Sequence, residues 1–235
     1  MSKPIIPLIN EDEMLNAPAG KMGMIRDDDI DNGKANIEAF TLEYLSPANK
    51  IKNDFTGGKT CCFCVSYKCC PDSDKNFQKL YISHPEALSM GAVALHPESN
   101  KVIGAVVSTT FGVKCSSDDE VMHKCKKGEV YISWFAVSQG NRGKGAGSKL
   151  LKWVEANARA RGATKITLGV VAGNPAIRLY ERFGFTKQSN DFCSRLIENC
   201  FTCICLGSPN GGCGGFTMEK VLTADNDISQ SQNVK

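Results

Sequence analysis

The sequence predicts an α/β (α+β) fold, in which a mixed central sheet is flanked by helices. Stretches typical of strands and of helices alternate through most of the chain. Residues 130–171 show a strand–helix–strand pattern, the unit that places two parallel strands in one sheet. The composition, with 42% hydrophobic and 23% charged residues among 235, is sufficient for one large domain with a sizeable core.

The N-terminal part is expected to be the less regular one. Residues 1–21 are polar, with Ala, Pro and Gly, and predict a flexible arm. A short strand is expected at 22–30 and a helix over 29–45, because apolar residues fall mostly on one side of such a helix. These residues are Ile37, Phe40, Leu42 and Leu45. Residues 46–78 are expected to form a loop that holds a first Cys-rich insertion at about 56–75.

The middle of the chain reads as three strands. MGAVALHP (90–97) and KVIGAVVSTT (101–110) predict two buried strands joined by a turn at 98–100. Residues 112–128 form a polar connection that carries Cys115, His123 and Cys125. GEVYISWFAVS (128–138) is rich in β-branched and aromatic residues and predicts a further strand.

The C-terminal part predicts two helices and three strands. A helix follows the glycine-rich stretch 139–147 and ends at Gly162, and KITLGVV (165–171) is the next strand. GNPAIRLYERFGF (173–185) predicts a short helix with Asn174 as its N-cap and Pro175 at its first position. The remaining segments are a strand at 185–187, a second Cys-rich insertion at about 190–215, a final strand at 215–222 and a disordered tail at 224–235.

Charge and hydropathy exclude several classes of partner. The net charge of +3 is too small to indicate nucleic-acid binding. The sequence contains no run of 18 apolar residues, so no transmembrane segment is predicted. The N-terminal apolar stretch is short, is broken by Pro4 and Pro7 and does not resemble a signal peptide. We therefore expect a cytoplasmic, or nuclear, location.

The stretch QGNRGKGAG (139–147) predicts an anion site. Glycines at a helix N-terminus let a diphosphate approach backbone N–H groups that have no partner in the helix. The spacing fits neither a Walker A loop nor a dinucleotide fingerprint. It does fit Arg142-x-x-Gly145-x-Gly147, placed between a strand and a helix.

This motif resembles the pyrophosphate-binding motif [QR]-x-x-G-x-[GA] of the GNAT N-acetyltransferase superfamily. The resemblance extends over about residues 22–223, the expected domain, through segments in the order of the family's elements. These segments are GMIRDDDID…EAF, KVIGAVV, EVYISWFAV, NPAIRLYERFGF and TMEKVL. It implies a GNAT fold with about six or seven strands, and acetyl-CoA as co-substrate.

The resemblance also implies which residues bind acetyl-CoA. Backbone N–H groups of the fourth strand would meet the thioester oxygen, the glycine stretch would bind the pyrophosphate, and Asn174 would contact the CoA arm. Tyr180 would protonate the leaving thiolate; the alternative is a core tyrosine with a satisfied hydroxyl. The implied residues of the fourth strand and the glycine stretch are Phe135, Ala136, Val137, Arg142, Gly143, Lys144, Gly145, Ala146 and Gly147.

The general base is where the sequence departs from many relatives. A glutamate common in the family is replaced here by Tyr131. Some relatives pair such a tyrosine with a histidine on the next strand, but the matching residue is Gly169, so that pair is absent. Glu129 lies on the same face of the strand as Tyr131, as period-two alternation requires. Tyr131 and Glu129 are therefore the candidate bases, with a solvated strand-start residue as the alternative for Glu129.

Nine of the twelve cysteines fall in two clusters, CCFCVSYKCC and CFTCICLGSPNGGC. By family topology both segments border the acceptor site, so the clusters are hypothesised to meet over its mouth. Three interpretations stay open: a zinc site, S-acylation, and packed or redox-paired thiols. No metal ligand is assigned, because a second C-x-x-C with standard spacing is lacking.

The predicted function is acetyl-CoA-dependent N-acetyltransfer to a primary amine by direct attack. The partners are acetyl-CoA and an amine on a small molecule or a protein; the acceptor and the oligomeric state are not predicted. The alternatives are a CoA-binding sensor without catalysis and a Cys-rich metal-binding module.

Overall fold

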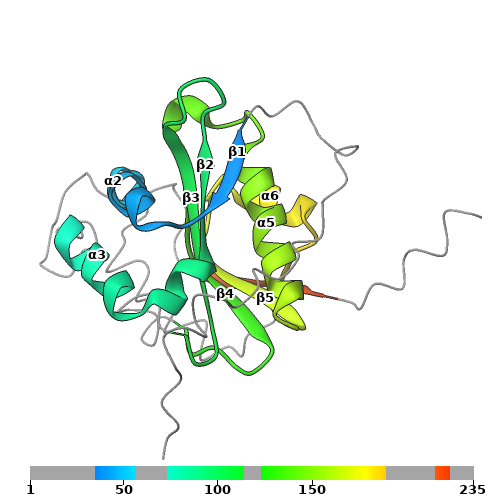
Figure 1. Ribbon diagram of the computed structural model, residues 1–235. Coiled ribbons are helices and arrows are strands. Elements are labelled where there is room, and N and C mark those ends of the chain that lie inside the picture. Colours follow the sequence, from blue (N-terminus) through cyan, green and yellow to red (C-terminus); the bar gives the residue numbers. More distant parts are fainter. Residues whose placement is uncertain (1–34, 57–72, 114–122, 189–214, 223–235) are drawn as a thin grey trace, which may run out of the picture.

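The computed structural model describes residues 35–56, 73–113, 123–188 and 215–222, which form a seven-stranded mixed sheet in the order β1-β2-β3-β4-β5-β7-β6 (Figure 1). The strands are β1 (Asn36–Ala39), β2 (Gly91–Leu95), β3 (Val102–Thr110), β4 (Glu129–Val137), β5 (Lys165–Val171), β6 (Thr186–Lys187) and β7 (Gly215–Val221). The α-helices are α2 (Leu45–Thr56), α3 (Asp74–Ser83), α5 (Ala146–Ala160) and α6 (Ile177–Arg182). Short 3-10 helices lie at Leu42–Tyr44, Pro85–Met90 and Gln139–Asn141.

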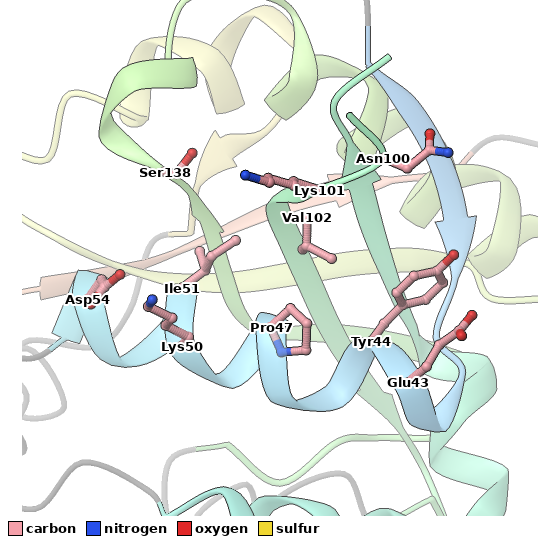
Figure 2. Close-up of a pocket in the computed structure, with 10 residues that line it drawn as sticks. All are labelled: Glu43, Tyr44, Pro47, Lys50, Ile51, Asp54, Asn100, Lys101, Val102 and Ser138. Carbon is pink, nitrogen blue, oxygen red and sulfur yellow. The ribbon is translucent and has the colours of Figure 1, made fainter. Parts of the chain in front are cut away.

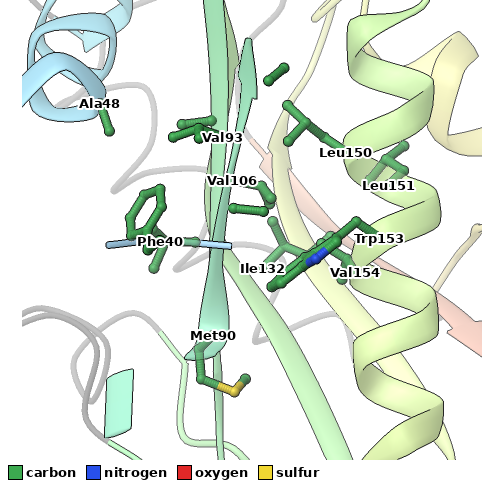
Figure 3. Close-up of a cluster of buried hydrophobic side chains, with 14 of the residues drawn as sticks. Phe40, Ala48, Met90, Val93, Val106, Ile132, Leu150, Leu151, Trp153 and Val154 are labelled. Atoms are coloured by element: carbon green, nitrogen blue, oxygen red, sulfur yellow. The ribbon is translucent and has the colours of Figure 1, made fainter. Parts of the chain in front are cut away.

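Helices cover both faces of the sheet. Figure 1 shows α2 and α3 on one face and α5 and α6 on the other. In Figure 3 the side chains of Phe40 and Ala48 lie on the α2 side, and those of Leu150 and Val154 reach the sheet from α5. The strands between the two layers are therefore apolar on both sides: every residue of β2 and most of β3 are buried.

The strand pair β4–β5 is the parallel pair of the sheet, and it is joined through α5, as the strand–helix–strand pattern predicted. The two strands pair from Glu129↔Lys165 only as far as Ile132↔Leu168. Beyond that point β4 stays on β3 and β5 stays on β7, so the two strands part in the middle of the sheet. The β3–β4 register also shifts at Val107/Ser108, where one extra residue, Ser133, bulges out of β4.

The predicted helix over 29–45 is wrong. Residues 36–39 form strand β1, which pairs antiparallel with β2, and the α-helix begins only at Leu45. The apolar residues that suggested one helix belong to two elements: Ile37 lies opposite Ala94 in the sheet, and Phe40 packs in the core beyond the strand end. The helical pattern of these residues is overridden here, because pairing with the buried strand β2 stabilises the extended conformation more. The loop expected at 46–78 is likewise replaced in its described parts by α2 and the start of α3.

The later elements confirm the prediction. β2, β3, β4, α5, β5, β6 and β7 lie within two or three residues of the predicted ranges, and Gly162 ends α5 with φ 68°. The strand expected at 22–30, the arm, the tail and both cysteine clusters lie outside the described residues. Within the described ranges, no helix is both long and apolar enough to cross a membrane.

Candidate active site

The gap between β4 and β5 leaves one edge of β4 without a partner among the strands that the structure describes. Val137 O accepts a hydrogen bond from Arg142 Nε (3.0 Å), so the peptide groups of Val137 point away from β3. The next residue points the other way, since Ser138 N–H donates to Ile103 O at 2.8 Å. By alternation Phe135 also presents its N–H to the open edge, whereas that of Ala136 is directed to β3.

The glycine stretch lies at the end of this edge and forms the start of α5. Gly143 and Gly145 have left-handed φ angles of 74° and 82°, and Gly145 is the N-cap of the helix. No side chain within the described ranges caps this helix, so its first N–H groups have neither an intrahelical acceptor nor a capping oxygen there. The arrangement suits an anion such as a pyrophosphate. Arg142 and Lys144 are both exposed beside it.

Close packing fixes the N-terminus of α5 against β4. A Cβ on Gly147 would lie 3.2 Å from Phe135 Cζ and 3.3 Å from Leu179 Cδ2. Phe135 in turn meets the ring of Tyr180 edge-to-face, with ring centroids 6.1 Å apart. Phe135 thus joins β4, α5 and α6 on one face of the sheet.

Tyr180 lies on α6 beside the open edge. It is 7% exposed and packs against Phe185 as well as Phe135. Burial raises the pKa of the Tyr180 phenol above its ordinary value. The hydroxyl therefore keeps its proton at neutral pH, as an acid must before it donates.

Asn174 does not start α6 as the sequence suggested, because the helix begins at Ile177. Its Oδ1 instead accepts a hydrogen bond from Ala176 N–H at 2.9 Å, in the turn that leads to the helix. An asparagine in such a turn bonds its own backbone two residues on, which explains why the helical signal appeared early. Gly184 follows the helix with a left-handed φ of 82°.

Tyr131 faces the opposite side of the sheet, on the face that α2 and α3 cover. Its neighbour Ile132 lies on the α5 side of the sheet in Figure 3, so by alternation Tyr131 points away from α5. A Cβ on Gly169 would lie 3.2 Å from the Tyr131 hydroxyl. Gly169 is exposed and lies at the point where β4 and β5 part, so any side chain at this position would crowd the Tyr131 hydroxyl.

Glu129 is buried rather than solvated, with 1% of the residue exposed. Its Oε1 accepts from Thr167 Oγ1 at 2.7 Å and lies 2.9 Å from His123 Nε2, and its Oε2 accepts from Lys126 N–H at 2.9 Å. Lys165 Nζ lies 3.8 Å from Oε1. Burial alone would raise the pKa of Glu129, but the hydrogen bonds outweigh it and leave that pKa below its ordinary value. Glu129 is therefore a fixed carboxylate.

His123 is the residue that the sequence analysis missed. It enters from the β3–β4 connection, and its ring stacks on that of Tyr131 with centroids 4.4 Å apart and an angle of 17° between planes. Tyr131 thus does have a histidine partner, but not at Gly169 on the next strand. The sequence signal was present as a lone histidine six residues before Glu129 in a polar connection, where no periodicity assigns it to a face.

A separate cavity of about 480 Å³ lies between α2 and the adjoining ends of β3 and β4 (Figure 2). Its charged lining residues are Glu43, Lys50, Asp54 and Lys101. Ser138 connects it to the glycine stretch, but none of the predicted catalytic residues lines it. The cavity is therefore distinct from the region around Tyr131 and Tyr180.

The zinc hypothesis gains no support from the described ranges, in which no three His, Cys, Asp or Glu side chains are grouped so as to hold a metal ion. Both cysteine clusters lie outside those ranges. The hypothesis that the two clusters meet concerns residues that the structure does not describe, so it stays a prediction. In chain order one cluster falls between α2 and α3 and the other between β6 and β7.

Comparison with known proteins gives matches in sequence and in structure. The sequence model of the Acetyltransferase (GNAT) family matches residues 59–185. Acetyltransferase Atu2258 of Agrobacterium fabrum is 31% identical over 96 residues, which cover 40% of this chain and 58% of that protein. The match thus spans less than two thirds of that relative's length.

Among solved structures, Ard1 from Thermoplasma volcanium has a TM-score of 0.55 and 17% identity, covering 81% of this chain and 99% of its own. The yncA protein from Salmonella typhimurium, solved with acetyl-CoA, has a TM-score of 0.54 and 18% identity, covering 81% and 95%. At such identities the likeness shows a common fold.

Proposed function

Because the chain belongs to the Acetyltransferase (GNAT) family, we propose that it transfers an acetyl group from acetyl-CoA to a primary amine by direct attack. The observation that carries this proposal is the coincidence of two features at one place. The sheet parts between β4 and β5, and the uncapped glycine turn at the start of α5 lies at the end of the exposed β4 edge.

The glycine turn binds the pyrophosphate of the co-substrate through backbone N–H groups, with the glycines Gly143, Gly145 and Gly147 keeping the backbone accessible. Lys144 and Arg142 add positive charge, and Ala146 contributes a first-turn N–H. The pantetheine arm then runs along the open edge of β4 toward Tyr180, past Asn174. The presence of acetyl-CoA in the structure of the Salmonella neighbour supports acetyl-CoA as the co-substrate.

The reaction begins when the neutral amine nitrogen attacks the thioester carbonyl carbon. The carbonyl oxygen gains negative charge and is stabilised by N–H groups on the β4 edge, of which Phe135 and Val137 point the right way. The attacking nitrogen gives up one proton to a base on the acceptor side, the C–S bond breaks, and the departing sulfur takes the proton of the Tyr180 hydroxyl, which is then restored from solvent. The products are an N-acetyl amine and CoA.

The acceptor reaches the thioester from the Tyr131 side of the sheet. Gly169 carries no side chain there, and Tyr131 supplies a polar group beside the point where the strands part, held through His123 by the buried Glu129. The Oγ of Ser133, in the bulge, is buried with no hydrogen-bond partner among the described residues, and it offers the acceptor a further polar contact.

Native mass spectrometry of the purified protein with acetyl-CoA tests the first half of the proposal. We expect one ligand per chain, and a well-folded protein that binds none would overturn it. The second half is tested by acetyl transfer to three probes: a peptide with a free N-terminal alanine, an N-blocked peptide with one lysine, and spermidine. Binding without transfer to any of them would favour the CoA-binding sensor.

A further inference from the structure

We propose that His123 is the general base that takes the proton of the acceptor amine, and that Glu129 is its positioning residue. The inference rests on the proposed acetyl transfer. It assigns a role to a residue outside the strand that carries the other candidates, and it separates the tasks of Glu129 and Tyr131.

Two contacts fix the orientation of the His123 imidazole ring. Nε2 of His123 lies 2.9 Å from Glu129 Oε1, and the ring lies flat on Tyr131. Glu129 is itself fixed by Thr167 Oγ1 and by Lys126 N–H. A hydrogen bond to one edge and a stacked ring on one face leave the imidazole little freedom to rotate, although it comes from a connection rather than a strand.

The partners of Glu129 determine which ring nitrogen carries the proton. Thr167 and Lys126 donate to Glu129, and the low pKa of Glu129 keeps it a carboxylate, which only accepts. Nε2 of His123 must therefore be the N–H donor in this contact. In the neutral ring Nδ1 then holds the lone pair that accepts a proton. The logic is that of a carboxylate orienting a histidine in a catalytic triad.

Exposure distinguishes His123 from the other candidates. Glu129 is sealed, with 2% of its side chain exposed, so an amine cannot reach its oxygens. The side chain of His123 is 26% exposed, so it can both meet an acceptor and release a proton to solvent. Tyr131 lies between His123 and the space beside Gly169, where its hydroxyl orients the amine or a bridging water.

The test compares His123→Ala and His123→Gln with the untagged wild-type protein, using the three amine probes and acetyl-CoA. We expect kcat/KM for the amine to fall by about 10²- to 10⁴-fold in both variants, the range for loss of a general base. The KM for acetyl-CoA should not change. His123→Gln serves as the conservative variant, because its amide still donates to Glu129 but does not take up a proton.

Rescue separates proton transfer from packing. Added imidazole should restore activity to His123→Ala in a saturable manner, because the vacated site opens to solvent, and it should not accelerate the wild-type protein. His84→Ala is the matched control: this histidine also faces a glutamate, Glu86 at 3.4 Å, but outside the site, and its loss should leave kcat/KM unchanged.

Each outcome is decisive. Full activity of His123→Gln, or a loss in His123→Ala that imidazole does not restore, overturns the role of His123 while acetyl transfer stands. If the wild-type protein acetylates none of the probes, the proposed function fails and the inference fails with it.

Discussion

The hydroxyl of Tyr131 faces Gly169 across the point where β4 and β5 separate, and a methyl group on that glycine would lie 3.2 Å from the oxygen. The two strands pair in register through Tyr131↔Thr167 and Ile132↔Leu168, so Gly169 is the first residue of β5 beyond the pairing. In the proposed acceptor site, the absence of a side chain at Gly169 is what would let an amine approach the hydroxyl.

Gly169→Ala should therefore impair use of the acceptor more than use of acetyl-CoA. The added methyl carbon would lie 3.2 Å from the Tyr131 hydroxyl oxygen, which is closer than an ordinary van der Waals contact, and it would occupy the space beside that hydroxyl. We expect the KM for the amine to rise about tenfold, equivalent to about 1.4 kcal/mol, while the KM for acetyl-CoA stays constant. Steady-state kinetics with each substrate varied in turn measures both; equal changes in the two constants would contradict the assignment.

Gly143→Ala should weaken acetyl-CoA binding in the glycine turn. The residue has φ 74°, and no atom of the described residues lies within 4 Å of an added Cβ, so the substitution strains the backbone without a clash there. Gly162→Ala, at the other end of α5 with φ 68° and the same open surroundings, is the matched control. Each should cost about 1–2 kcal/mol of stability.

Binding distinguishes the two glycine variants. Loss of a hydrogen bond to a charged phosphate corresponds to about 1.5–3 kcal/mol, so the Kd for acetyl-CoA should rise roughly tenfold or more in Gly143→Ala. Isothermal titration calorimetry should show no change in Gly162→Ala. An equal weakening in both would mean that strain in α5, not the anion site, controls affinity.

Tyr180→Phe should reduce kcat and leave the fold intact. The variant removes one proton donor and retains the ring that packs on Phe135 and Phe185. We expect kcat to fall about 10²- to 10⁴-fold, with binding of acetyl-CoA retained. Tyr81→Phe, which alters a fully buried tyrosine on the other face of the sheet, should leave kcat unchanged. A Tyr180→Phe protein of normal kcat would make Tyr180 a packing residue.

Glu129 should make stability depend on pH. Its folded-state pKa lies below the ordinary carboxyl value of about 4.3, so its stabilisation is complete above that value and is lost as pH falls through the folded pKa. Glu129→Gln should be less stable at neutral pH by about 1–3 kcal/mol, because an amide cannot accept all three hydrogen bonds. Urea unfolding between about pH 3 and pH 7 should show the difference narrowing toward acid. A constant difference would contradict the assignment.

The sequence predicted the C-terminal half of the fold well because local and long-range preferences agree there. EVYISWFAV combines high β-propensity with burial on both faces, and the glycines that start and end α5 have the left-handed φ angles that glycine favours. Around residues 36–45 the local pattern of apolar residues favours a helix, whereas long-range pairing with β2 favours a strand at residues 36–39. Short β1 is held by its pairing with β2, a contact that lies more than fifty residues away in the chain and leaves no periodic signal.

The site shows the same division. The position of the glycine turn could be predicted from one motif, since its chemistry is carried by backbone and needs only local geometry. The stacking of His123 on Tyr131 could not, because a histidine in an irregular connection has no period that tells which strand residue it meets. The burial of Glu129 was also missed, since Thr167, His123 and Lys126 compensate a cost that sequence alone assigns to any buried carboxylate.

The parting of β4 and β5 has a consequence for the protein when its co-substrate is scarce. A sheet with unpaired peptide groups in its interior carries, in effect, two extra edges, and edges are where sheets recruit foreign strands. A pantetheine arm lying along β4 would close that edge much as a strand does. Saturation with acetyl-CoA would then raise the melting temperature and slow self-association, which couples the lifetime of the folded protein to the acetyl-CoA supply of the cell.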